Sequence, residues 1–592
     1  MSVEPRAPRR IERRVPTGPA PLMPDLHPVL DRIYRSRGLT SASELDLSLG
    51  QLLPFQALSG IESAVALLEH AVCADRSILF IGDFDADGAT SCAVGVRALR
   101  AMGASRVQFL VPNRFEFGYG LTPELVDAAA RYEPELLITV DNGISSHDGV
   151  CAANARGIDV LITDHHLPGP TLPPAAAIVN PNVEGDAFAS KSIAGVGVIF
   201  YTMIALRARL RARGWFTPST VPEPNLGTLL DLVALGTVAD VVNLDHNNRV
   251  LVAQGLERIR RGRANPGISA LLQVGGRDQH RVGATDLAFA AAPRLNAAGR
   301  LDDMTVGIEC LLTDDHGQAE QLAEVLNDLN RERREIESTM RAQAEAALGA
   351  LDVVESQSTV CLFDDSWHSG VVGILAGRIK DRFNRPTIVF APDPVGGLKG
   401  SGRSVKGVHI RDALEGVATK HPGLIAKFGG HAMAAGLAIE RSNFDAFRVA
   451  FEGEVAARHP PGQATPVILS DGELSGPEFS VDFAERLASA GPWGQEFAEP
   501  VFDNHFAVRE ARRVGGRHLK LRLASHDASE LEAIAFNVLA PSGTAEEADI
   551  DVGPHIHAAY RLEVDEYRGR KRLQLVIEHF QTTDPSASSA TI

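Results

Sequence analysis

The sequence predicts an α/β protein with a parallel-sheet domain, a long connecting helix, a smaller α/β domain and a C-terminal β-barrel domain. Three observations predict this fold class. Short apolar runs alternate with helical stretches from residue 77 to residue 179, as in a parallel sheet covered on both faces. Apolar residues recur at helical spacing between residues 317 and 351. Near the C-terminus, residues 518–523 alternate strictly between leucine and a cation.

Length and composition limit the possible classes of protein. A chain of 592 residues should hold about three or four domains. The formal net charge of −17 provides no global basic field, so a polyanionic partner would have to find local basic patches. The five cysteines form no CxxC pair, which argues against a disulfide framework or a zinc ribbon and suits a reducing cytosol. With no secretory signal and no apolar run long enough to span a membrane, we expect a soluble, cytoplasmic protein without a membrane partner.

The first half of the chain reads as a basic arm followed by the parallel-sheet domain. Residues 1–25 are rich in arginine and proline and are expected to be disordered. The parallel-sheet domain, residues 26–316, has mainly helices after residue 200. Its five expected strands are Ser77–Ile81, Val107–Val111, Leu136–Val140, Val160–Thr163 and Ala176–Val179. Residues 317–352 form the expected connecting helix, with one apolar and one charged face.

The second half begins with another α/β pattern, residues 353–458. A loop rich in proline and glycine follows, and residues 465–581 look all-β. The strands at 558–565 and 572–580 flank residues 566–570, a plausible hairpin turn. Residues 582–592 are rich in serine and alanine and are expected to be disordered.

Four segments of the first domain are each expected to end a hydrophobic strand in an acid or a histidine. Because ligands of open sheets gather at the carboxyl ends of strands, these side chains should converge. Like charges crowd together only when a cation neutralises them. Carboxylates with one imidazole favour Mn²⁺ or Mg²⁺, and two such ions can hydrolyse a phosphoester. The candidate ligands are Asp83, Asp85, Asp87, Asp141, His165 and Asp240.

Each motif has a simpler explanation when it is taken alone. An isolated Asp-x-Asp is most often a solvated turn, Asp141-Asn142-Gly143 is a good turn sequence, and Asp240 could cap a helix. The first three acids alternate, so in extended chain they would share one side, with Gly88 turning into a helix that begins near Thr90. Four coincidences together favour a metal site over these explanations.

These motifs resemble the DHH phosphoesterase superfamily, and within it the RecJ family of bacterial exonucleases. The residues that carry the resemblance are Asp164-His165-His166 with the three other acidic motifs, in this order, and the similarity extends from Pro28 to Phe580. The resemblance implies that one metal binds Asp85 and Asp141 and the other binds Asp87, Asp141, His165 and Asp240. It also places His166 beside the scissile phosphate, so the resemblance adds His166 to these metal ligands as a catalytic residue. Whether Asp83 and Asp164 touch metal directly stays open.

The resemblance also identifies residues 353–458 as a DHHA1 domain that binds phosphate. Its three glycine-rich segments let backbone amides approach an anion, although Gly370, Gly373 and Gly377 could equally form a helix-packing stripe. Arg294 and Arg300 could instead make structural ion pairs. The expected phosphate contacts are Arg114, Arg294, Arg300, Ser401, Arg403 and His431.

The C-terminal β segment resembles the OB-like module that such exonucleases carry after DHHA1. OB-folds bind single strands by backbone charge and by base stacking. A run of charges is usually only a solvated face, so this surface depends on the resemblance. The expected nucleic-acid surface consists of His518, Lys520, Arg522, Tyr567, Arg568 and Arg570, with Phe536 available for stacking.

The resulting hypothesis is a metal-dependent exonuclease with two Mn²⁺ or Mg²⁺ ions. The resemblance implies single-stranded DNA as substrate, 5′→3′ polarity, release of mononucleotides and a role in DNA repair and recombination. It also suggests a monomer that meets single-strand-binding protein and repair helicases. One alternative is a DHH phosphodiesterase of short oligonucleotides or cyclic dinucleotides. Another is a single-strand-binding protein that has lost its metal.

Overall fold

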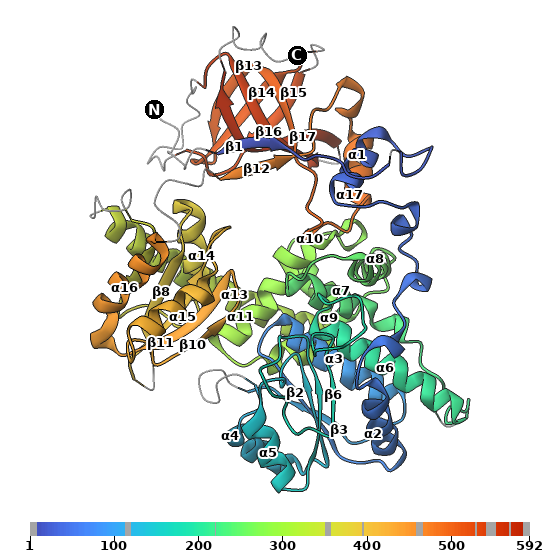
Figure 1. Cartoon of the computed structure of the whole chain (residues 1–592). Helices are drawn as coiled ribbons and strands as arrows, with labels where there is room; N and C mark the ends of the chain where they lie inside the picture. The colour runs from blue at the N-terminus through green and yellow to red at the C-terminus, as the bar shows by residue number, and fades with distance from the viewer. Residues whose placement is uncertain are drawn as a thin grey trace. The chain divides into compact units, whose positions relative to one another are not determined.

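The computed structural model describes most of the chain in two compact units (Figure 1). Unit 1 comprises Met1–Ala42, Ile336–Gly491 and Glu499–Ile592, and unit 2 comprises Ser43–Glu335 and Pro492–Ala498. The described residues are 9–19, 21–112, 120–219, 221–349, 357–393, 396–457, 466–526, 530–539, 552–567 and 570–583. The predicted fold class is confirmed, since the structure contains the parallel sheet, the long helix, the second α/β domain and the barrel.

Unit 2 is built on a five-stranded parallel sheet with strand order β3-β2-β4-β5-β6. The central strands β2 and β4 are buried along their whole length, as expected when helices cover both faces of a sheet. The strands are β2 (Ile78–Gly82), β3 (Val107–Leu110), β4 (Leu136–Val140), β5 (Asp159–Thr163) and β6 (Ala177–Val179). All five expected strands are present, within one residue at each end.

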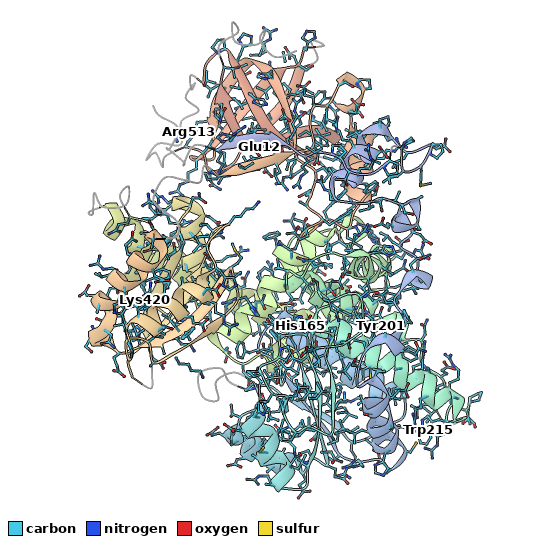
Figure 2. The ribbon with its side chains drawn as sticks, in the orientation of Figure 1. Glu12, His165, Tyr201, Trp215, Lys420 and Arg513 are labelled. Atoms are coloured by element: carbon cyan, nitrogen blue, oxygen red, sulfur yellow. The ribbon has the colours of Figure 1, made fainter. Side chains whose placement is uncertain are left out.

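The helices of unit 2 cover this sheet and then form a helical extension. Among the first group, α6 is buried along most of its length, and its Tyr201 (Figure 2) donates a 2.6 Å hydrogen bond to Asn247. The first group is α2 (Ile61–Cys73), α3 (Ala86–Ala101), α4 (Pro123–Ala129), α5 (His147–Ala155) and α6 (Gly195–Ala212). The extension is α7 (Leu230–Ala239), α8 (His246–Arg260), α9 (Pro266–Val274), α10 (Ala284–Asp286), a π-helix (Leu287–Ala291), α11 (Ala292–Leu301) and α12 (Thr305–Leu312).

Two local predictions in unit 2 are wrong. The helix expected near Thr90 begins at Ala86, because the Asp85 carboxylate already caps its first turn. Asp87 therefore lies in a helix and not in extended chain. The segment that ends in Asp240 was expected to end a strand, but it is the last turn of α7, whose continuous apolar run packs among helices.

The long helix α13 (His316–Gly349) runs from unit 2 into unit 1. The second α/β domain follows it with a five-stranded sheet of order β10-β11-β9-β8-β7, in which only β7 and β8 are parallel. Its strands are β7 (Val360–Phe363), β8 (Thr387–Pro392), β9 (Leu398–Arg403), β10 (Lys427–Gly430) and β11 (Ala434–Ile439). Its helices are α14 (Val372–Phe383), α15 (Ile410–Lys420) and α16 (Phe444–Ala456).

A closed five-stranded barrel completes the chain, with strand order β13-β14-β15-β17-β16. The leucines at 519, 521 and 523 are buried inside it, as their alternation predicts. The strands are β13 (Phe502–Val514), β14 (His518–Ala524), β15 (Glu530–Ala535), β16 (His555–Tyr567) and β17 (Arg570–Thr582). Helix α17 (Val481–Ser489) packs against β16 and β17.

The N-terminal segment is partly ordered, which corrects the expected disorder of residues 1–25. Residues Arg10–Arg13 form strand β1, which pairs in parallel with β12 (Val467–Ser470), and α1 (Pro28–Ser36) follows. The Arg13 guanidinium hydrogen-bonds Asp503 of β13 at 2.8 Å. A buried acid thus gives the arginine-rich segment a fixed partner that its composition does not reveal.

Within the described residues no single helix is both long and apolar enough to cross a membrane; only the bent pair Leu49–Ala57 and Ile61–Cys73 passes by length and composition. All five cysteines are free thiols.

Candidate metal centre

The centre lies where the order of the parallel sheet reverses. The chain leaves β2 for β3 on one side and later places β4 on the other, so a crevice opens beyond the ends of β2 and β4. Asp83 follows β2, Asp141 follows β4, and Asp164 follows β5. The sheet topology therefore brings together three acids that are far apart in the sequence.

The first turn of α3 orients Asp85 and Asp87. The Asp85 carboxylate accepts 3.0 Å hydrogen bonds from the amides of Asp87 and Gly88 and so caps the helix. The Asp87 carboxylate accepts hydrogen bonds from the amides of Gly195 at 2.7 Å and Val196 at 2.9 Å, at the N-terminus of α6. Both carboxylates are thus held by backbone donors, which fixes their positions before any ligand binds.

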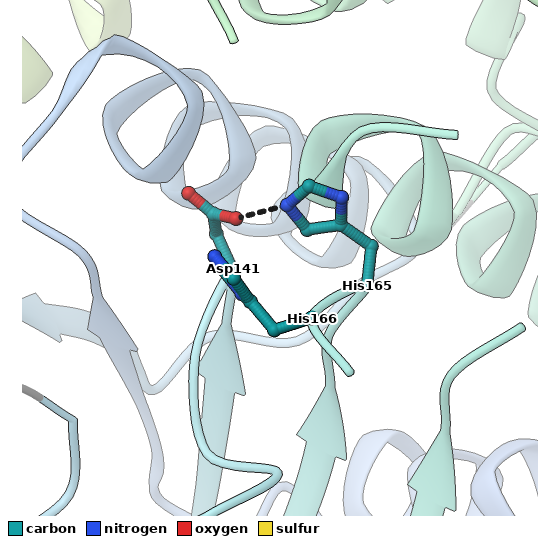
Figure 3. A group of neighbouring side chains, drawn as sticks. All are labelled: Asp141, His165 and His166. Carbon is teal, nitrogen blue, oxygen red and sulfur yellow. Dashed lines mark ion pairs between the residues drawn. The ribbon is translucent and has the colours of Figure 1, made fainter. Parts of the chain in front are cut away.

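Asp141 is the acid that lies beside His165 in the candidate metal site (Figure 3). It adopts a left-handed backbone with φ of 61° and is 2% exposed. Its Oδ1 is buried, accepts no hydrogen bond from the described residues and lies 3.1 Å from Nε2 of His165. The same Nε2 lies 3.5 Å from Asp240 at the end of α7. A divalent cation would satisfy these oxygen and nitrogen atoms together.

His166 points to a different acid. Its Nδ1 lies 2.7 Å from Oδ1 of the buried Asp164, which also accepts hydrogen bonds from the amides of Ile144 and His165. Burial would lower the pKa of His166, but the hydrogen bond and the charge of Asp164 outweigh burial and raise the pKa to about 9. His166 therefore carries a positive charge at neutral pH. The Asp164 oxygens are occupied by these donors, so Asp164 positions the two histidines.

The raised pKa values of the carboxyl groups are those expected of a site that binds a cation. Burial, and then the charge of Asp85, raise the pKa of Asp87 to about 7. Burial and the neighbouring carboxylates raise the pKa values of Asp141 and Asp240 well above the ordinary range. A bound divalent cation would reverse these shifts by stabilising the ionised forms.

The donor set fits Mn²⁺ or Mg²⁺. Three groups of side chains each place their ligand atoms within 4.8 Å of one another: Asp83 with Asp85 and Asp141, Asp87 with His165 and Asp240, and Asp141 with His165 and His166. Oxygen donors with imidazole and no thiolate suit these ions. The structure therefore brings together all the ligand candidates of the sequence analysis.

Sequence reasoning missed the residues that hold this centre in place. The Asn296 side chain accepts from the amide of Ala86 at 2.8 Å, and Asn182 donates to the carbonyl of His165. Asn180 donates to the carbonyl of His166, and Asn142 to those of Ile81 and Val140. Asn180, Asn182 and Asn296 lie outside the acidic motifs, whereas Asn142 lies within Asp141-Asn142-Gly143, and no local pattern distinguishes any of them from turn residues.

Two of the predicted phosphate contacts, Ser401 and Arg403, lie on β9 in unit 1. The Arg403 guanidinium donates to Ser401 Oγ at 3.1 Å. A Cβ at Gly373 would lie 3.0 Å from that Oγ and 3.1 Å from Arg403 Nη2, so α14 begins directly beside this pair. Helix N-terminus, hydroxyl and guanidinium together form a suitable cradle for an anion. By contrast, a Cβ at Gly377 would meet nothing within 4 Å, so Gly377 belongs to no packing contact.

The other predicted phosphate contacts have different surroundings. Arg294 is 7% exposed and donates to the carbonyls of Ala290 and Val274 and to Asn327, which supports a structural role in place of the expected contact. Arg300 lies on α11, where Gly299 packs against the carbonyl of Phe84, so α11 borders the loop that carries the candidate ligands Asp83 and Asp85. His431 is exposed after β10. Arg114 lies outside the described residues.

The predicted nucleic-acid surface carries acids as well as cations. On β14, Lys520 Nζ lies 2.7 Å from Glu532 of β15, and Arg522 lies 3.4 Å from Glu510 of β13. The His518 ring packs edge-on against Phe536, which is 46% exposed. Arg570 is exposed at the start of β17, whereas Arg568 and the side chain of Tyr567 lie outside the described residues.

Comparison with known proteins assigns families to the three parts of the chain. The DHH family N-terminal domain matches residues 77–237, the DHHA1 domain residues 356–457, and the RecJ OB domain residues 470–579. The single-stranded-DNA-specific exonuclease RecJ of Dickeya dadantii is 53% identical over 96% of this chain and 98% of its own length. Two crystal structures of RecJ from Thermus thermophilus are also similar. The Mn²⁺ complex has a TM-score of 0.79, 31% identity and coverage of 97% of this chain and 80% of its own. The Mg²⁺ complex has a TM-score of 0.74, 29% identity and coverage of 97% and 79%.

Proposed function

The chain belongs to the family of RecJ single-stranded-DNA-specific exonucleases, and from this premise we propose that it hydrolyses single-stranded DNA from the 5′ end to mononucleotides. It is a metal-dependent exonuclease that uses Mn²⁺ or Mg²⁺. The observation that carries the proposal is the grouping of Asp85 with Asp141, and of Asp87 with His165 and Asp240, in ligand sets within 4.8 Å at the switch of the sheet. This is the donor set that two-metal phosphodiester hydrolysis requires.

The residues have separate roles in the proposal. Asp85 and Asp141, with Asp83 beside them, would hold one ion, and Asp87, His165 and Asp240 the other, with Asp141 common to both. Bound there, the metal ions would lower the pKa of a water and stabilise charge on the phosphodiester oxygens. His166, kept protonated by Asp164, would hold a positive charge and a proton near the scissile phosphate. Ser401 and Arg403 would bind a phosphate of the strand.

The alternative of a phosphodiesterase for very short or cyclic substrates is less well supported. The C-terminal barrel occupies residues 502–582, and a domain of that size is unnecessary for a dinucleotide. The 53% identical exonuclease is similar over 96% of this chain, barrel included. A preference for dinucleotides over long strands would favour the alternative.

The test is cleavage of a 5′-labelled oligonucleotide with Mn²⁺. Asp141→Ala should abolish cleavage and leave strand binding largely intact, because it removes the common metal ligand without touching the barrel. Asp148→Ala is the matched control, since Asp148 is exposed in the first turn of α5. Excess chelator should stop the wild-type reaction. Full activity of Asp141→Ala would refute the metal site. The 5′→3′ polarity would be refuted if a strand labelled at its 3′ end released the labelled mononucleotide first.

Partners and compartment are part of the same proposal. We infer a cytoplasmic monomer that acts with single-strand-binding protein and with repair helicases, because its substrate is single-stranded DNA. Light scattering would show a dimer if the prediction of a monomer is wrong. Pull-down of the purified partner proteins would test the interactions directly.

A further inference from the structure

Unit 2 contains a second feature that the proposed function does not use, a cavity of about 430 Å³. The C-terminal part of α3, the start of α7 and the N-terminus of α9 line it. Its walls are apolar at Leu226, Leu229, Leu232 and Pro266. Small-molecule sites typically have volumes of about 300–1,000 Å³ and mainly apolar walls with a few charged groups. The cavity therefore has the size of a small-ligand site, with a lining that is partly apolar and partly charged.

Arginines dominate the charge around this cavity. Arg97, Arg100 and Arg258 line it, with Asp314 as the only acid among its lining residues. A smaller cavity of about 230 Å³ shares Arg258 and Asn225 and adds Arg261 and Arg263, with Glu257 as its acid. Of these arginines, Arg258 is paired with Asp231 and Arg261 with Glu257, but cations still outnumber acids among the lining residues, which favours an anion.

Arg258 is held by one long ion pair with a buried acid. Its Nε is buried and donates no hydrogen bond to the described residues, although it lies 3.6 Å from Asp231 Oδ2. That same oxygen already accepts a 2.6 Å hydrogen bond from the amide of Asn265. The Arg258 side chain as a whole is 25% exposed and lines the cavity, so its guanidinium is accessible to an anion bound there.

Arg97 donates hydrogen bonds to the carbonyls of Leu311 at 3.4 Å and Leu312 at 2.8 Å, and it makes one further contact that an anion could replace. It forms an ion pair with Asp314, whose side chain is 82% exposed. Exposed pairs of this kind contribute little to stability. A phosphate could displace the Asp314 carboxylate and accept two parallel hydrogen bonds from the guanidinium, which is the stronger arrangement.

The cavity is separate from the metal centre. Asp87 and Arg97 lie on the same helix, ten residues apart, which is roughly 15 Å at the rise of an α-helix. On α7, Leu230 and Asp240 are likewise at opposite ends. The two helices pack against each other, so both run from the cavity to the centre. A ligand in the cavity would not touch the metal ligands.

We propose that this arginine-lined cavity binds a nucleoside monophosphate, at a site distinct from the metal centre. The phosphate would contact Arg97, Arg100 and Arg258, and the base would lie against the leucines and Pro266. The apolar wall favours a nucleoside over a bare phosphate, because inorganic phosphate would leave that surface unused. The proposal does not depend on the proposed catalytic function.

The test is calorimetric binding of deoxyadenosine monophosphate to the full-length protein in excess EDTA, which removes the metal centre as a competing site. We expect one-to-one binding that persists in Asp141→Ala. Arg258→Gln should weaken it about tenfold or more, since a hydrogen bond to a charged group is lost. The matched control is Arg213→Gln, an exposed arginine at the end of α6 that pairs with Glu69 outside the cavity.

Two further measurements keep the proposal falsifiable. If Arg258→Gln unfolds at a lower temperature than the wild type, the exposed Arg100→Gln replaces it, and its binding should also weaken. Inorganic phosphate, titrated in the same way, should bind several-fold more weakly than the nucleotide. Absence of binding in EDTA, equal affinity for inorganic phosphate, or unchanged affinity in Arg100→Gln would each overturn the proposal.

Discussion

Gly195, the first residue of α6, controls the position of the central acid. A Cβ at this residue would lie 2.7 Å from both Cβ and Oδ1 of Asp141, closer than real Cβ atoms approach other atoms. Gly195→Ala should therefore displace the carboxylate and reduce cleavage at least a hundredfold, as 1 Å misplacements in active sites do. Gly377→Ala is the control, because it is also at a helical glycine but has nothing within 4 Å. Comparable activity of the two variants would contradict this account.

Asp164 is expected to act through the histidines that it positions. Asp164→Asn keeps the shape of the side chain but removes the charge that holds a proton on His166. Replacing such a supporting residue typically costs about 10–100-fold in activity. We expect a fall of that size in kcat with little change in KM, measured on a labelled single strand. A change confined to KM would instead assign Asp164 to substrate binding.

At this scale the sequence predicted which acids and histidines lie together but not the residues that support them. Acids at the ends of elements are recognisable because the ends of parallel strands share one edge of a sheet. Asn182 and Asn296 are not recognisable, since their contacts join segments that are 17 and 210 residues apart. Arg294 stays a predicted phosphate contact, although only the structure reveals the carbonyls to which its guanidinium donates.

At the scale of elements, hydrophobic patterns predicted strands and helices correctly where the burial of each element matches its pattern. The run Leu136–Val140 is a strand at its predicted limits because both faces of β4 are buried. The predictions for the start of α3 and for the segment before Asp240 were wrong. In the first case a side-chain cap set the boundary, and in the second a short apolar run was compatible with either a strand or a buried helix. The π-helix at Leu287–Ala291 has no sequence signal at all.

On strand β14 and its neighbour β15, substitutions of a cation and of the acid beside it should have opposite effects on DNA binding. Arg522 pairs across the sheet with Glu510 on one side and Glu532 on the other, so acids partly neutralise the predicted nucleic-acid surface. If the strand face binds DNA, Lys520→Gln should weaken binding and lower its salt dependence by about one counterion. Glu532→Gln should strengthen binding a few-fold, because it frees Lys520. Fluorescence anisotropy over a range of salt concentrations measures both. Unchanged affinity in both variants would exclude this face.

At the scale of the whole molecule, residues near the N-terminus contact the C-terminal part of the chain in unit 1. Strand β1 pairs with β12, and Arg13 hydrogen-bonds Asp503, a contact between residues 490 positions apart. Asp503 is 1% exposed and is also bonded to His557 at 3.0 Å and to Ser470. The arginine-rich segment is thus part of the barrel's support, which composition alone could not indicate.

This contact makes unit 1 sensitive to acid. Burial would raise the pKa of Asp503, but its hydrogen bonds to His557, Arg13 and Ser470 prevail and hold the pKa well below the usual range. A carboxyl with a depressed pKa stabilises the folded state above its unfolded pKa of about 4, and this stability is lost as pH falls below that value. Asp503→Asn should cost about 2 kcal/mol at pH 7, where a hydrogen-bonded charge is lost, and less at pH 3. Thermal unfolding at both pH values measures the difference, with Asp148→Asn as an exposed control. An equal loss of stability at pH 7 and at pH 3 would show that packing, and not the ionised carboxylate, joins the ends of the chain.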